Sequence, residues 1–467
     1  MKIQKNIFIV CWIVSIIMAL STGCKTPEAF VRQTATSLPD TNSGMADTTL
    51  VNDLSGNIFF NDPYLKLLID TALENNWDAQ IALERIEVAR TEFQQTRSAL
   101  LPQVFGTANA SVNRVSKNAF NQPNQNRFFG TDVFTAFQSS WEIDIWKRLR
   151  NRRRASYLRL LSTGQGLQLL RTNLVAEVAQ RYFRLLTLDS IQAIVERNIK
   201  LQEEAARVIS IQKEGGRATE LAVKQFKAQL LNTKSLQVEY RQQIVDTENE
   251  LNRLLGRLPQ PIYRSTVVAD TFYQTAFNSV PSALLLRRPD VQQAELELQA
   301  FETDIAVARA AFLPTLTITP FVGLNATNPV KLINPGSIVY GLVGGITAPL
   351  FNRISIENDY ERSMALARQA FLSYQRTIYA SYNEVATNLK QINNLTEMHQ
   401  LKREQTETLQ EAVGVSNDLY LAGYASYLEV IIAQGSVLQA ELELISVKNR
   451  MYQSQVDLYR SLGGGWR

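Results

Sequence analysis

The sequence predicts an α+β membrane protein built from two similar halves, with short strands that join a transmembrane β-barrel and very long helices beyond it. Three observations lead to this prediction. They are an internal duplication, two long stretches without proline, and two pairs of segments in which apolar residues alternate with small or polar ones. Elements of this length do not fit in a compact globule, so an extended helical assembly is expected.

The duplication is visible in short matching segments. The sequence RSALLP at 97–102 returns as RAAFLP at 309–314, with four of six residues identical. The segment 216–223 matches 423–430 at a spacing of 207 residues, and a second pair near the end of each half has the same spacing. Solenoid repeats have periods of roughly 20–50 residues. One half-molecule has therefore been duplicated, and function is expected where the halves meet or differ.

The N-terminus has the pattern of a secretory signal. Lys2 and Lys5 precede an apolar run over 7–20, and the small residues 21–23 lead directly to Cys24. The apolar run is too short to span a membrane as a mature helix. Small residues before a cysteine resemble a lipobox, so Cys24 is expected to be lipidated and to become the mature N-terminus. An ordinary signal peptide followed by a chance cysteine is the alternative.

Long helices are expected where proline is missing. None of the 14 prolines lies in 124–258 or in 350–467. Because proline costs about 3 kcal/mol in a helix interior, both spans permit very long helices. Apolar residues in them recur at steps of three, four or seven, as in packed helices. A continuous helix over 148–214 would be ~100 Å long at 1.5 Å per residue.

Strands are expected at about 103–115 and 133–145 in the first half, and at about 315–325 and 338–350 in the second. Strands of about ten residues with one apolar face fit a membrane barrel, and a soluble two-sheet core is the alternative. Bacterial single-chain barrels have at least eight strands, and open strand edges are not tolerated in lipid. If these four strands span a membrane, several chains must contribute to one barrel.

These elements define an expected domain organisation. A lipoprotein signal peptide over 1–23 is followed by an extended segment over 24–60. The first repeat covers 61–258, with long helices at about 148–255, and a linker follows over 259–280. The second repeat covers 281–467, with one helix before its strands and long helices at about 355–462.

Several motifs resemble one known family. LRRPDV at 286–291 and IAVARAAFLP at 305–314 look like the core signature of outer-membrane efflux lipoproteins, the TolC-like, NodT-type exit ducts of tripartite pumps. WEIDIW at 141–146 is similar to the strand-to-helix junction of this family. YLAGYASYL at 420–428 and LGGGW at 462–466 complete the resemblance, which covers nearly the whole chain after the proposed lipidation site.

The resemblance implies a homotrimer in the outer membrane, lipid-anchored at Cys24. Three protomers would share a twelve-stranded barrel, four strands from each, that continues into a long periplasmic α-helical barrel. The implied function is passive conduction of drugs or other small toxic compounds, delivered by an inner-membrane pump of the resistance-nodulation-division (RND) class through a periplasmic adaptor. An exit channel for type I protein secretion and a structural coiled-coil envelope lipoprotein are the alternatives.

The resemblance also implies site residues. Gly216 and Gly423 match the helix-turn tips at the periplasmic mouth, which contact the adaptor. Glu429 and Tyr420 match residues of the pore constriction and gate. A second acidic residue found in some relatives is Ile432 here, so the gate is expected to differ in detail. An ordinary exposed helix carboxylate is the alternative interpretation of Glu429.

Composition argues against other classes of function. The net charge of +4 is mild and does not indicate nucleic acid. His399 is the only histidine, and it has no histidine or cysteine partner for a metal site. Cys11 lies within the predicted signal peptide, so the mature chain would have no internal disulfide. No phosphate-binding loop occurs, and we expect no enzyme activity, no cofactor and no resident metal.

Two charged segments have structural explanations. The run 147–154 carries six cations in eight residues and should lie just below the barrel, against phospholipid headgroups or carboxylates of a neighbouring protomer. In Arg288-Pro289-Asp290, proline suits a first helical turn and aspartate complements the positive end of the helix dipole. This triplet is therefore expected at a helix entry and not at an active site.

Overall fold

The computed structural model describes residues 62–114, 129–265, 285–349 and 353–464. Cys24, the predicted signal peptide over 1–23, the segment over 24–60 and most of the predicted linker over 259–280 lie outside these residues. The chain divides into two compact units. Within the described residues, the first unit lies in 85–163 and 293–374, and the second lies in 62–84, 164–292 and 375–464. Each unit therefore contains residues from both halves of the sequence.

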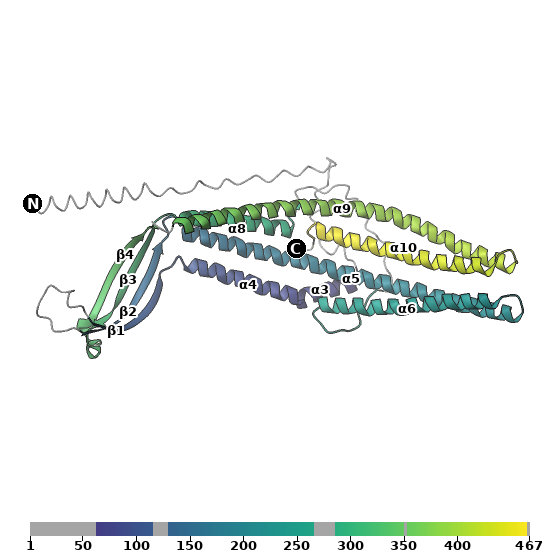
Figure 1. Ribbon diagram of the computed structural model, residues 1–467, viewed down its shortest axis with the longest axis horizontal. Helices are drawn as coiled ribbons and strands as arrows, with labels where there is room; N and C mark the ends of the chain where they lie inside the picture. The colour runs from purple at the N-terminus through teal and green to yellow at the C-terminus, as the bar shows by residue number, and fades with distance from the viewer. Residues whose placement is uncertain (1–61, 115–128, 266–284, 350–352, 465–467) are drawn as a thin grey trace, which may run out of the picture. The chain divides into compact units, whose positions relative to one another are not determined.

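The first unit contains one antiparallel sheet in the order β1-β2-β3-β4 (Figure 1). Its strands are β1 (Gln103–Arg114), β2 (Phe129–Ile143), β3 (Thr315–Ala326) and β4 (Ile338–Thr347). Short 3-10 turns at Pro329–Lys331 and Pro335–Ser337 connect β3 to β4. The inner strands come from different halves of the chain, and they pair with Phe137 opposite Val322. One edge of β1 and one edge of β4 have no neighbour in this sheet.

The strands differ from the expected ranges mainly at three ends. β2 begins at Phe129, four residues before the expected start, and the other two differences have a local cause. β2 ends at Ile143, two residues before the expected end, because the next residue caps a helix. Both carboxylate oxygens of Asp144 accept hydrogen bonds, from the N–H groups of Leu149 and Arg150 at 3.0 Å each. β4 ends at Thr347 and not at 350, since Pro349 has no N–H to donate to a ladder.

The helices include the longest elements of the chain. They are α3 (Pro63–Asn75), α4 (Trp77–Ser98), α5 (Arg148–Glu214), α6 (Glu220–Leu254), α8 (Pro289–Ala310), α9 (Arg353–Leu421) and α10 (Tyr427–Ser461). α5 has 67 residues and α9 has 69, so each is about 100 Å long. α5 runs without a break through Gly164 and Gly166. A glycine costs about 1 kcal/mol relative to alanine in a helix interior, but the neighbouring Ser162 and Leu167 are buried, and such tertiary packing outweighs that cost.

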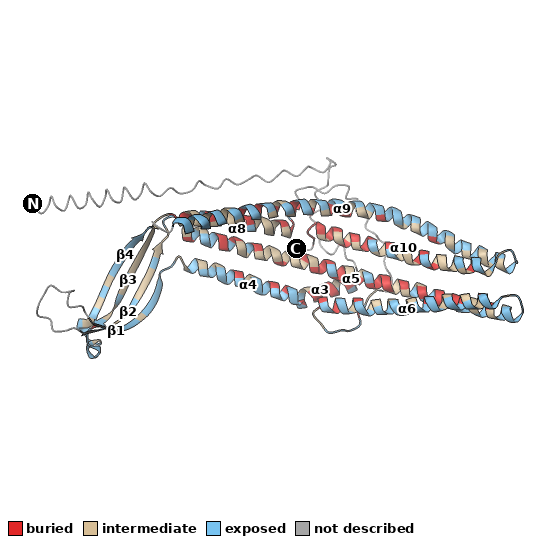
Figure 2. Cartoon of the chain, in the orientation of Figure 1, coloured by how far each residue is buried: buried red, intermediate tan, exposed pale blue. Residues whose placement is uncertain are grey.

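In the second unit, α5 and α6 form one helical hairpin and α9 and α10 form another (Figure 1). Figure 2 shows buried residues along α5 and α10, and most of these buried residues are apolar. The main core joins α3, α5, α6 and α10 through fully buried side chains, which include Leu65, Tyr182, Leu185, Leu251 and Tyr459. α10 is the one helix in the described ranges that is long and apolar enough to cross a membrane, by length and composition only. Core helices meet the same criterion.

Arg288 anchors the second half of the chain within this unit. Arg288 is 8% exposed, and its guanidinium donates to Asp290, to Glu384 at 2.9 Å and to the carbonyl oxygen of Ser461 at 2.5 Å. Pro289 occupies the first position of α8. The Arg-Pro-Asp triplet therefore lies at a helix entry, where it also holds the end of α10, and it has a structural role.

Four helix ends share one backbone geometry. Gly216, Gly256, Gly423 and Gly463 all have positive φ, between 66° and 81°. In each case the glycine N–H bonds to the carbonyl three residues earlier, and the following N–H bonds to the carbonyl five residues earlier. This is the Schellman helix ending, which favours glycine. The four glycines form two pairs at the 207-residue spacing, so the duplication is preserved in hydrogen bonding as well as in sequence.

We predict that Gly256→Ala lowers stability more than Gly216→Ala. Both changes force alanine into the left-handed region, at about 1–2 kcal/mol. A Cβ at Gly216 meets open space, whereas a Cβ at Gly256 overlaps the carbonyl oxygen of Asn75. Overpacking adds about 1–3 kcal/mol at that site alone. Thermal unfolding of the detergent-solubilised variants measures the difference, and equal midpoints would contradict this account of the helix ends.

Candidate functional site at the paired helical turns

The turns of the two hairpins are nearly identical in backbone and different in side chains. The α5–α6 turn is built around Gly216 and the α9–α10 turn around Gly423, and a Cβ at either glycine would meet nothing within 4 Å. Thr219 and Ser426, again 207 residues apart, cap the helices that follow. Both tips are therefore exposed turns of the same backbone geometry, with open space around the glycine.

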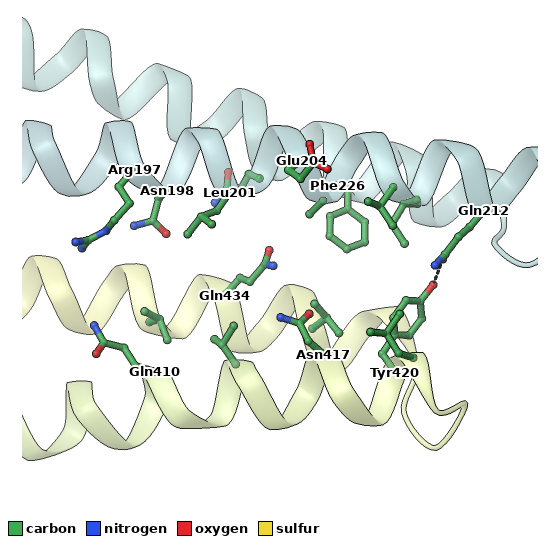
Figure 3. Close-up of a pocket in the computed structure, with 18 of the residues that line it drawn as sticks. Arg197, Asn198, Leu201, Glu204, Gln212, Phe226, Gln410, Asn417, Tyr420 and Gln434 are labelled. Atoms are coloured by element: carbon green, nitrogen blue, oxygen red, sulfur yellow. Dashed lines mark hydrogen bonds between the residues drawn. The ribbon is translucent and has the colours of Figure 1, made fainter.

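Tyr420 links the two hairpins. Its hydroxyl donates a hydrogen bond of 2.6 Å to the side-chain oxygen of Gln212 on α5 (Figure 3). The ring packs beside a buried apolar cluster formed by Ile209, Ala222, Phe226 and Val430, from both hairpins. Sequence reasoning identified Tyr420 but missed its partner Gln212. A glutamine on a helix surface is common, and no spacing or motif distinguishes this one.

Glu429 is engaged with its own helix. Together with Ser426 it forms a capping box, in which its carboxylate accepts from the backbone N–H of Ser426 and, at 2.7 Å, from the Ser426 hydroxyl. Hydrogen bonding to that hydroxyl, and then to the N–H, holds the pKa of the Glu429 carboxyl below its ordinary value of 4.5. The residue is exposed, so its negative charge is available at the tip while the helix start is fixed.

The first copy carries a different arrangement at the same place. Glu220 pairs with Lys213, and Lys224 lies 3.4 Å from the same carboxylate. Hydrogen bonds from Lys213 and then Lys224 lower the pKa of Glu220. Lys213 occupies the position that corresponds to Tyr420, and Ala222 the position that corresponds to Glu429. The aromatic link and the titratable cap therefore belong to the second copy alone.

A cavity of about 710 Å³ lies between the hairpins beside the Tyr420–Gln212 link (Figure 3). Farther from the tips, Glu441 on α10 lies in its wall and is 7% exposed. Its carboxylate accepts from Arg197 at 3.0 Å, Asn198 at 3.2 Å and Gln410 at 2.9 Å, residues of α5 and α9. This network was not predicted from the sequence. It fixes the spacing of three helices at the level of the cavity, because a buried carboxylate must keep its partners.

In the described ranges, no group of three or more His, Cys, Asp or Glu side chains is arranged to hold a metal ion. His399 lies half-buried on α9.

A four-stranded sheet with free edges, long helical hairpins and two glycine turns define the class of outer-membrane channel proteins. The family model described as outer membrane efflux protein matches residues 68–257 and 280–464. The chain belongs to this family, and the two matched segments correspond to its two repeats.

Individual relatives agree with this assignment. The chain is 26% identical to the solvent efflux pump outer membrane protein SrpC of Pseudomonas putida, over 87% of each chain. It is 28% identical to the toluene efflux pump outer membrane protein TtgF of Pseudomonas putida, over 89% of this chain and 86% of the relative. It is 27% identical to the cation efflux system protein CusC of Escherichia coli, over 88% of each chain.

Solved structures share the fold. A crystal structure of CusC matches with a TM-score of 0.83 at 24% identity, covering 94% of this chain and 99% of that one. The outer-membrane channel OprN matches with a TM-score of 0.86 at 23% identity, covering 95% and 99%. The predicted fold class is confirmed: it is the fold of trimeric TolC-like channels, with four strands per chain, long helices and an internal duplication.

Family membership also confirms the predicted role as an efflux exit duct and the predicted outer-membrane location, while the lipid anchor at Cys24 stays a prediction. The protein is the outer-membrane exit duct of an efflux pump, with a long periplasmic helical portion, and it is a passive channel and not an enzyme.

We predict that acid loosens the start of α10 through Glu429. Because the pKa of Glu429 is lowered in the folded protein, its contribution is complete above its ordinary pKa of 4.5 and is lost as the pH falls through the folded value. Hydrogen exchange in the first turn of α10, corrected for the intrinsic rate, should therefore rise in acid. Glu429→Gln is the control, since glutamine keeps a capping box without titrating. An equal acid response in both proteins would exclude Glu429 as the cause.

Proposed function

We propose that three copies of this chain close one twelve-stranded barrel and conduct small toxic compounds outward. The main support for a trimeric assembly is the strand order of the sheet, which leaves one edge of β1 and one edge of β4 unpaired. In lipid each unsatisfied backbone group costs several kcal/mol. Four strands from each of three chains satisfy both edges without leaving any strand exposed. Membership in the efflux family supports the same assembly.

The proposed partners are a periplasmic adaptor and an inner-membrane pump of the RND class. Relatives named for solvent, toluene and cation efflux support a role in exporting small toxic compounds and do not single out one substrate. Gly216 and Gly423 are the proposed adaptor contacts, because both turns are exposed and open. We also propose a lipid anchor at Cys24, from the lipobox-like sequence before it. A type I secretion pump in place of the RND pump is the competing proposal for the inner-membrane partner.

The gate is proposed at the second-copy turn. Tyr420 holds α9 against α5 through Gln212, and Glu429 places a negative charge one turn beyond Ser426. When the hairpins move apart to widen the periplasmic mouth, the Tyr420–Gln212 bond must break. Ile432 is 59% exposed on the same helix and adds no second charge. The closed state therefore depends more on the hydrogen bond between hairpins than on a cluster of carboxylates.

We predict that Tyr420→Phe raises the open fraction of the channel in planar lipid bilayers. A neutral hydrogen bond contributes about 1 kcal/mol, so its loss should shift the closed-to-open equilibrium roughly fivefold. Gln212→Leu should have a similar effect, and the double variant should show little beyond either single change because both remove one bond. Single-channel recording of opening frequency gives the measurement.

Tyr424→Phe is the matched control, since Tyr424 lies at the same turn with its side chain 85% exposed. If Tyr420→Phe opens no more often than Tyr424→Phe, the proposed gate is wrong. A wild-type protein with no conductance would leave no opening frequency to compare, so the recording is made with wild type, Tyr420→Phe and Tyr424→Phe side by side.

A further inference from the structure

The cation-rich run at 147–154 is only partly used within the chain. Arg148 forms a bidentate pair with Glu142, at 2.6 and 2.8 Å from one guanidinium nitrogen. Arg150 pairs with Asp144 at 2.9 Å and also donates to its carbonyl oxygen at 2.7 Å. The carboxylates at the end of β2 are thus already occupied by the first two arginines of the run.

Four cations of the run are left over. The side chains of Lys147, Arg152, Arg153 and Arg154 are exposed and make no ion pair or hydrogen bond with any residue in the described ranges. They lie at the turn before α5 and in its first two turns, and the first turn of α5 contains no acidic residue. Cations near the positive end of a helix dipole are unfavourable. An external anion would remove this repulsion.

The second copy shows that the junction itself does not require this charge. α9 also follows a strand and begins at Arg353, and the corresponding stretch, 352–359, contains that one cation with the acids Glu357 and Asp359. The charge of the run is therefore +6 at the first junction and −1 at the second. The basic surface is a property of one junction per chain.

The position of β2 argues against a neighbouring chain as the partner. β2 lies inside the sheet, with β1 on one side and β3 on the other (Figure 1). The free edges, where another chain would pair, belong to β1 and β4. α5 starts only a few residues after β2, so the run begins away from either edge.

Two tryptophans place the run at the level of lipid headgroups. Trp141 and Trp146 are 38% and 46% exposed, and their indole N–H groups donate to the carbonyl oxygens of Leu100 and Pro314. Exposed aromatic residues at strand ends mark the membrane–water interface of barrels. The cations begin one residue after Trp146. Arg154 lies eight residues after Trp146, or about 12 Å along the helix axis at 1.5 Å per residue. A long arginine side chain can reach back from there toward the interface.

We propose that Lys147, Arg152, Arg153 and Arg154 form a binding surface for the phosphate groups of anionic phospholipids in the periplasmic leaflet of the outer membrane. The proposal requires the outer-membrane location and is independent of the gate. Guanidinium groups bind phosphate through paired hydrogen bonds, and a basic cluster beside a membrane segment favours anionic lipid. The three chains of the channel would present three such surfaces around the barrel.

The test compares lipid preference in reconstituted protein. Wild type and the triple variant Arg152→Gln/Arg153→Gln/Arg154→Gln are placed in phosphatidylcholine vesicles containing brominated phosphatidylglycerol or brominated phosphatidylcholine. Quenching of tryptophan fluorescence, to which Trp141 and Trp146 contribute, gives the relative binding of the two lipids. Each basic residue near an anionic surface contributes about fivefold, so the triple variant should lose at least that much of the wild-type preference for phosphatidylglycerol. Added salt should weaken the wild-type preference.

The control removes equal charge elsewhere. Lys200→Gln/Arg217→Gln/Lys227→Gln changes three exposed cations of α5, the first turn and α6, and its lipid preference should match wild type. Glutamine has a helix propensity close to that of arginine, and unchanged single-channel conductance shows that the triple variant still assembles. An unchanged preference in the triple variant, or an equal loss in the control, would overturn the proposal. A change in ion selectivity without a change in lipid preference would instead assign these arginines to the channel lumen.

Discussion

The structure depends on one constraint, that no backbone N–H or C=O group is left unpaired in lipid. A sheet of four strands satisfies this constraint only between its strands, and the outer edges of β1 and β4 remain open. Closure must therefore come from other copies of the chain, which makes the pore a property of the assembly. The helices continue from the strands, so the same closure sets the number of hairpins around the periplasmic mouth.

Duplication supplies the repeated unit of this assembly, and divergence between the copies supplies its function. The two halves keep the same backbone hydrogen bonds at the paired glycine turns, 207 residues apart. The side chains at these two turns differ. The first turn carries the Lys213–Glu220 ion pair, and the second carries Tyr420 and the Glu429 capping box. Next to the strands it is the first copy that carries the distinctive side chains, since only this copy has the basic run 147–154 after its strand.

Sequence reasoning predicted those features that repeat along the chain. Alternation located the strands to within a few residues, and the absence of proline indicated helices as long as α5. It did not reveal contacts between segments far apart in sequence. Gln212 is an ordinary surface glutamine until the fold brings it to Tyr420, 208 positions later. The partners of Glu441 lie on two other helices, with Asn198 243 positions earlier. Strand ends set by Asp144 and Pro349 depend equally on local hydrogen bonding that periodicity does not report.

Disulfide cross-linking between β1 and β4 tests the central claim most directly. Within one chain these strands are separated by β2 and β3, about 14 Å at ordinary strand spacing, which is too far for a disulfide. A cysteine at Ala108 in β1 is combined in turn with a cysteine at each position of β4. Closure by three chains predicts that, in some registers, oxidation gives covalent dimers and trimers on a denaturing gel and nothing larger. Failure of every register, or a ladder that continues beyond three chains, would contradict the trimeric barrel.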